Sequence, residues 1–154
     1  MANFTTAGSD TFPAGHLLQV KSHYYASNAA LGTSTQNWPS TAIGFDNAIG
    51  GSSDVLMFFS ATFIDSGSGL NNYTDVYFNG GGFGDAAGTG GRKVIDAEMY
   101  KNTGEPSVRG NIGVHTLDLA PGSTTPTYNL HFVMGASMNL TVSAGTLTFM
   151  EIAG

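Results

Sequence analysis

A glycine-rich segment, Asn79–Lys93, has the composition of a loop whose backbone amides could bind a phosphate. Such loops follow a strand and lead into a helix N-terminus, and P-loops also end in Gly-Lys-Ser/Thr. Residues 93–100 instead alternate apolar and polar types as a strand does, and the Gly-Lys-Ser/Thr ending is missing. The segment is therefore predicted to be a surface loop.

The four histidines, His16, His23, His115 and His131, are dispersed along the chain and lack the spacing of a zinc site such as His-Glu-X-X-His. The sequence therefore predicts no metal ion and no other cofactor. His131 should point away from the apolar side chains on either side of it, as a surface or interface residue. Histidines repeated around a symmetry axis can hold an ion, and this alternative stays open.

Acidic residues cluster in two places without the pattern of a calcium or catalytic site. The stretch Asp65–Asp75 is rich in oxygen ligands but lacks the EF-hand spacing, so we interpret it as a turn. Asp96 and Glu98 share one face of an expected strand, where acids are usually just solvated rather than paired across a glycosidic bond. No Gly-X-Ser-X-Gly elbow is present. The chain is predicted to have no catalytic residues and not to be an enzyme.

Glu151 differs from the other acids because it shares a strand face with Leu147 and Phe149. A carboxylate on an apolar face needs a partner. The sequence leaves three partners open: a backbone donor, Arg109 or a neighbouring subunit.

Aromatic residues offer the main candidate for ligand contact. Tyr24, Tyr25, Trp38, Tyr73 and Tyr77 could stack on sugar rings in a site carried by loops, with Trp38, Tyr73 and Tyr77 as the main candidates. Trp38 stands next to Pro39, and a side chain there could instead plug the end of a sandwich. We favour packing for Trp38 and keep glycan contact as the alternative for all three.

Strand-like runs separated by Gly, Ser, Asn and Pro turns dominate the chain, and no long helical period is present. One short helical turn is expected at Ala29–Leu31. The pattern predicts an all-β antiparallel sandwich, with the jelly roll as the leading form. The expected strands are residues 16–24, 41–45, 54–65, 73–79, 92–100, 107–119, 124–136, 138–142 and 145–152.

Two of these strands, 54–65 and 145–152, carry apolar side chains on both faces. In the last strand, Leu147 and Phe149 should face one way and Ile152 the other, because side chains alternate. One small sandwich has a single core, so the second face is predicted to be covered by further copies of the chain. The expected trimer-interface residues are Leu56, Phe58, Leu147, Phe149, Met150 and Ile152.

The composition excludes several classes of function. Only 10% of the residues are charged, the net charge is −6, and the five Lys and Arg form no patch that could bind nucleic acid. Cysteine is absent, so neither disulfides nor thiolate zinc sites are expected. No apolar run approaches the roughly 18 residues of a membrane span. Residues 1–10 lack the apolar core of a secretion signal, so synthesis in the cytoplasm is expected.

The chain is predicted to comprise an arm, residues 1–15, and one sandwich domain, residues 16–154. The start of the domain (His16-Leu-Leu-Gln-Val20), Tyr128-Asn-Leu-His-Phe132 and the ending Leu147-Thr-Phe-Met-Glu-Ile-Ala-Gly154 resemble a domain of phage tail-fibre and virion proteins, those of cyanophages especially. This resemblance implies a trimeric jelly roll similar to C1q and tumour necrosis factor, with the first and last strands near the threefold axis.

The resemblance implies a structural protein on the virion surface, made in the host cytoplasm. The expected function is a trimeric decoration, or cement, protein on the phage head, with the major capsid protein as its partner. The arm, with Phe4 and Phe12, would anchor the trimer to the shell. The alternative is a receptor-binding tip of a tail or head fibre that binds host glycans.

Overall fold

The computed structural model describes residues 15–26, 29–33, 35–69, 71–84, 92–135 and 137–154. The two arm residues expected to anchor the chain, Phe4 and Phe12, lie outside the described residues, and so do residues 85–91 of the glycine-rich segment. No helix in the described ranges is long and apolar enough to span a membrane.

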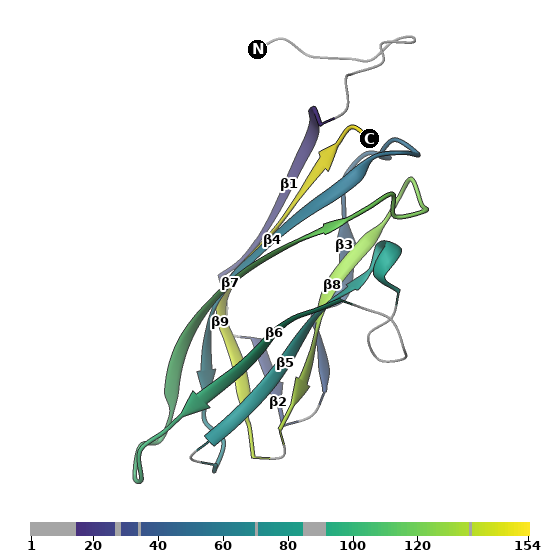
Figure 1. Ribbon diagram of the computed structural model, residues 1–154. Helices are drawn as coiled ribbons and strands as arrows, with labels where there is room; N and C mark the ends of the chain where they lie inside the picture. Colours follow the sequence, from purple (N-terminus) through teal and green to yellow (C-terminus); the bar gives the residue numbers. More distant parts are fainter. Residues whose placement is uncertain (1–14, 27–28, 34, 70, 85–91, 136) are drawn as a thin grey trace.

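The described residues form two antiparallel sheets that face each other (Figure 1). Sheet A contains β1 (Leu17–Tyr25), β2 (Ala29–Gly32), β4 (Asp54–Asp65), β7 (Val108–Asp118) and β9 (Leu140–Ile152). Sheet B contains β3 (Gln36–Gly44), β5 (Asn71–Gly80), β6 (Arg92–Tyr100) and β8 (Thr127–Met134), and a short 3-10 helix, η1 (Gly81–Phe83), follows β5.

The order of the strands is that of a jelly roll. Sheet A runs β1-β9-β4-β7, with β2 also paired to β9, and sheet B runs β3-β8-β5-β6. Apart from the β5–β6 pair and the short β2, successive strands cross from one sheet to the other, as in a double Greek key. The predicted all-β sandwich with jelly-roll order is confirmed. The first strand and the last strand lie side by side, with β1 at one edge of sheet A and β9 between β1 and β4.

Three local predictions were wrong. Residues 29–31 form part of β2 rather than a helical turn, because they pair with β9. The strand expected at 41–45 begins at Gln36, since Pro39 is tolerated in β3, an edge strand of sheet B. The turn expected at residues 143–145 is absent, because β9 continues through a register shift opposite Thr62 and Phe63.

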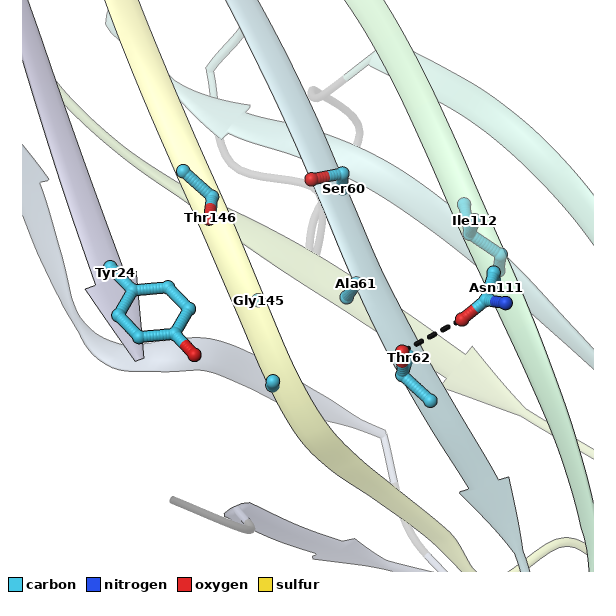
Figure 2. Close-up of a pocket in the computed structure, with 9 residues that line it drawn as sticks. Tyr24, Ser60, Ala61, Thr62, Asn111, Ile112, Gly145 and Thr146 are labelled. Carbon is cyan, nitrogen blue, oxygen red and sulfur yellow. Dashed lines mark hydrogen bonds between the residues drawn. The ribbon is translucent and has the colours of Figure 1, made fainter. Parts of the chain in front are cut away.

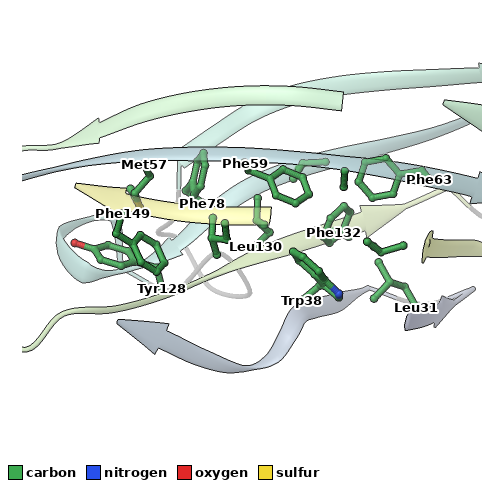
Figure 3. Packing of buried hydrophobic residues seen from close by; sticks show 14 of the residues in the cluster. Leu31, Trp38, Met57, Phe59, Phe63, Phe78, Tyr128, Leu130, Phe132 and Phe149 are labelled. Carbon is green, nitrogen blue, oxygen red and sulfur yellow. The ribbon is translucent and has the colours of Figure 1, made fainter. Parts of the chain in front are cut away.

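The core between the sheets is built around a continuous row of aromatic side chains (Figure 3). The ring of Phe59 lies 5.5 Å from that of Trp38 and 6.1 Å from that of Phe63. Phe63 in turn contacts Phe132 from sheet B at 5.6 Å. This single core accounts for the inner faces of both sheets, so the side chains on the outer faces take no part in it.

Candidate functional site

The outer face of sheet A carries a row of apolar side chains that crosses four strands. Residues directly opposite in an antiparallel sheet point to the same face. Val20 of β1 pairs with Met150 of β9, Met150 pairs with Leu56 of β4, and Leu56 pairs with Leu117 of β7. Together with two neighbours on the same side, these residues form what we call the apolar face. Its members are Val20, Leu56, Phe58, Leu117, Met150 and Ile152.

The side chains of the apolar face remain in contact with solvent in a single copy. Val20 is 49% exposed, Phe58 40% and Leu117 37%, while Leu56, Met150 and Ile152 are half-buried. Large contiguous apolar patches on soluble proteins mark contact surfaces. Two more exposed leucines extend the patch at the edges of the sheet: Leu17 beside β9 and Leu119 just beyond β7.

Only four of the six residues predicted for the trimer interface lie on this face. Leu56, Phe58, Met150 and Ile152 point outward, whereas Leu147 and Phe149 are fully buried in the core. Because their side chains are not accessible to a second copy, Leu147 and Phe149 are reassigned from the interface to the core. The sequence reasoning missed Val20 and Leu117. Alternation within β1 and β7 identifies Val20 and Leu117 as apolar residues on one face of their strands. Only the pairing of β1 with β9, and of β7 with β4, places them in the same row as Met150.

The carboxylate of Glu151 is buried, with the side chain 4% exposed, and its two oxygens accept three hydrogen bonds. The Gly50 backbone N–H and the Ser53 hydroxyl each donate to Oε1 at 2.7 Å, and the Gln19 amide donates to Oε2 at 2.8 Å. Of the partners left open by the sequence, the structure selects a backbone donor and two neutral side chains. Glu151 therefore ties β9 to β1 and to the loop before β4.

Removing the Glu151 carboxylate should destabilise the domain. Glu151→Ala leaves the buried Ser53 hydroxyl and the part-buried Gly50 N–H without their acceptor, so we expect a loss of about 3 kcal/mol in the free energy of unfolding. Glu151→Gln keeps one acceptor oxygen for Gly50 and Ser53, and its new amide N–H can donate to the oxygen of a rotated Gln19 amide, so the loss should be about 1 kcal/mol. Urea unfolding of both variants measures this, and equal small losses would contradict the role assigned to the carboxylate.

Two other buried acids also connect loops. Asp65, at the end of β4, accepts hydrogen bonds from the backbone N–H groups of Gly67 at 2.8 Å and Asn139 at 2.9 Å, and from the side chain of Asn72. Asp118 accepts from the Tyr128 hydroxyl at 2.9 Å and from a backbone N–H of η1 at 2.8 Å. Burial and the nearby Asp118 carboxylate raise the pKa of Tyr128. The oxygens of both acids are thus engaged in holding loops together.

The structure does not bring the three predicted glycan-contact aromatics together. Trp38 is 3% exposed and packs in the core, so the packing interpretation is correct for it. Tyr73 is 53% exposed on the outer face of sheet B, and Tyr77 is half-buried there against His131, with ring centres 6.4 Å apart. His131 points away from the core, as predicted, but it is only 5% exposed and its Nδ1 lies 2.6 Å from Asn37 Oδ1, so it is not the solvent-exposed residue that the sequence suggested.

No protein-family model matches the sequence, and none of the curated proteins does. Solved structures are similar in fold. Latent PorU from Porphyromonas gingivalis has a TM-score of 0.52 and 10% identity over 99% of this chain and 14% of that one. VP2 of infectious bursal disease virus has a TM-score of 0.48 and 13% identity, and the match covers 97% of this chain and 36% of VP2. Eiger TNF from S. frugiperda has a TM-score of 0.37 and 8% identity, and the match covers 74% of this chain and 66% of that one.

At these identities the likeness to solved structures concerns the fold alone. The chain spans 14% of the length of PorU and 36% of the length of VP2, so both proteins contain much that has no counterpart here. The sandwich part of the expected resemblance is confirmed, while its phage-specific part stays a prediction.

Proposed function

We propose that this chain is a virion structural protein that assembles as a homotrimer through the apolar face and decorates the head of a phage. The observation that carries the proposal is the apolar row from Val20 to Leu117, which one copy leaves uncovered on a sheet that already has a complete core behind it. Each large apolar side chain gains roughly 1.5–3 kcal/mol when a partner buries it fully.

The distribution of apolar side chains suits a closed ring of copies. In a head-to-tail contact, one patch of each copy binds a different patch of the next copy. Three copies form a closed ring when each is rotated by one third of a turn relative to the last. The two ends of the apolar row can supply these patches: Val20 and Leu17, 53% exposed, on the β1 side, and Leu117 and Leu119, 68% exposed, on the β7 side. The position of β1 and β9 within this sheet agrees with the threefold axis that the phage resemblance implies.

A role on a shell is supported by the chemistry of the chain as well as by the fold. Jelly rolls are a common architecture of viral capsid domains. Because few residues are charged, hydroxyl and amide groups provide most of the polar surface, which suits the outside of a virus particle. The partner would be the major capsid protein, reached through residues 1–14. The protein would act by adding contact area between capsomers, without catalysis.

Deletion of residues 1–14 tests this function. The described domain starts at Gly15, whose N–H donates to the Ala153 carbonyl at 2.7 Å, so this deletion leaves the first contact of the domain intact. We expect the truncated protein to form the same oligomer as the full chain but to bind expanded phage heads at least tenfold more weakly. Loading is measured by co-sedimentation with heads that lack the protein.

The full chain is the control for this experiment, and its location is checked independently by labelling intact particles with an antibody. Undiminished loading of the truncated protein would refute the role of the arm. Label found only at the tail would refute decoration of the head.

A receptor-binding fibre tip is the second candidate, and the exposed ring of Tyr73 on sheet B is the observation that favours it. Trp38 no longer supports this function, because its ring is enclosed in the core.

A further inference from the structure

A second feature of sheet A lies farther along its outer face, away from the chain termini. Two adjoining hollows of about 280 and 360 Å³ share Ser60 and Thr146, so together they form one groove across the strands. Figure 2 shows the first hollow, with Tyr24 on one side and Asn111 on the other. We call this the sheet A groove. Its main residues are Tyr24, Ser60, Thr62, Asn111, Gly113 and Thr146.

The lining of the groove combines hydroxyl and amide groups with apolar side chains such as Phe58. Among the lining residues, which all lie within the described chain, there is no Asp, Glu, Lys or Arg, and His115 at the far end is the one imidazole. Tyr24 offers a large ring that is 68% exposed. A groove with this lining favours a ligand that is neutral, rich in hydroxyl groups and able to stack on an aromatic face.

Several polar groups in the groove are positioned to bind such a ligand. Thr62 donates its hydroxyl hydrogen to Asn111 Oδ1 at 2.7 Å, which turns the amide nitrogen of Asn111 away from Thr62 as a hydrogen-bond donor (Figure 2). The hydroxyls of Ser60 and Thr146 make no hydrogen bond to another side chain in the described part of the protein. The sheet holds all these groups on rigid strands rather than on loops.

Gly113 keeps the second hollow open. It lies opposite Ser60 on the outer face, and a Cβ atom placed on it would meet nothing within 4 Å. Its φ is not in the left-handed region, so the backbone does not require glycine here. A larger side chain at this position would fill space in the groove without displacing the protein's own atoms.

We propose that the sheet A groove binds a neutral saccharide, with a sugar ring stacked on Tyr24 and its hydroxyls bonded to Ser60, Asn111 and Thr146. The absence of basic residues from the lining argues against acidic sugars and phosphates, which need cations. The combined size, near the range of about 300–1,000 Å³ for small-molecule sites, fits one or two sugar units. The second hollow meets the apolar face at Phe58, which lines it. The first hollow contains no residue of the apolar face, so the inference does not rest on trimer formation.

The test uses the full chain on an array of neutral oligosaccharides of glucose, galactose, mannose and N-acetylglucosamine, with sialylated and sulfated glycans alongside. Binding to at least one neutral glycan is expected, and calorimetry then gives its affinity. Tyr24→Ala should weaken that affinity about tenfold through loss of stacking. Gly113→Val, which adds a side chain suited to a strand, should weaken it at least as much by filling the groove.

Tyr100→Ala is the matched control, because Tyr100 is a similarly exposed tyrosine, 62% exposed, on the opposite sheet. This variant should bind the neutral glycan as the unmodified protein does. The inference is overturned if no neutral glycan binds, if only acidic glycans bind, or if Tyr24→Ala and Gly113→Val both leave the affinity unchanged. Loss of binding in Tyr73→Ala alone would place the site on sheet B and support the receptor-binding function instead.

Discussion

Trp38→Ala should lower the free energy of unfolding by about 3–5 kcal/mol, the range for removing a large aromatic side chain from a well-packed core. The Trp38 ring contacts Tyr25 at 4.8 Å and Phe59 at 5.5 Å, so it joins β1, β3 and β4. It also lies against Gly145 of β9, where a Cβ atom would come within 2.7 Å of the ring. The cavity left by the Trp38 ring cannot close easily, because strands of both sheets surround it. Denaturant unfolding measures the loss.

Tyr73→Ala is the control for stability, since replacing an exposed aromatic residue should lower the free energy of unfolding by no more than about 0.5 kcal/mol. A Trp38→Ala protein with nearly unchanged stability and impaired glycan binding would contradict the packing role and restore the ligand-contact interpretation.

Met150→Lys should convert the assembled protein into single copies. Met150 occupies the middle of the apolar row, between Val20 and Leu56. A lysine there would place a charge within the proposed interface, where three copies bring three such charges into an apolar environment. Each copy should still fold, because residue 150 is only half-buried and a long side chain can reach solvent. Analytical ultracentrifugation should show a species of about 15.9 kDa.

Thr141→Lys is the matched control for this variant. Thr141 is also half-buried and belongs to β9, but it pairs with Ala30 and Ile64 at the opposite end of the strand. This variant should keep the mass of the unmodified protein. If both lysine variants stayed assembled, the contact between copies would have to lie elsewhere.

Alternation of side chains was a sufficient guide to the most regular strands. Successive side chains of Asp54–Asp65 point to opposite faces, and apolar residues occur on both. The predicted bounds of this strand are the bounds of β4. Alternation also identified the two faces of the last strand. It could not tell which face meets the core, because Leu147 and Phe149 are as apolar as Met150 and Ile152. That choice depends on packing against sheet B.

Local turn chemistry misled the prediction where tertiary packing overrides it. Ser143-Ala144-Gly145 has the residues of a turn, yet β9 passes through it because Gly145 fits closely under the Trp38 ring. The partners of Glu151 were also beyond sequence reasoning. Gly50 and Ser53 lie about a hundred residues away and reach Glu151 only because the β3–β4 loop folds over the end of β9.

The groove on sheet A was missed for a similar reason. Tyr24, Ser60, Asn111 and Thr146 come from four strands. Tyr24 was one of five aromatics considered for sugar stacking, but nothing in the sequence connects it with the other three residues. Only the order β1-β9-β4-β7 brings them together. The apolar row likewise depends on register, which alternation within one strand does not provide.

The mass of the purified full chain in dilute solution tests the central claim most directly. If copies of the chain cover the apolar face of one another, light scattering at micromolar concentration should give about 48 kDa, three times the 15.9 kDa of one chain. A stable species of about 16 kDa, with Val20, Met150 and Leu117 accessible to solvent, would contradict it.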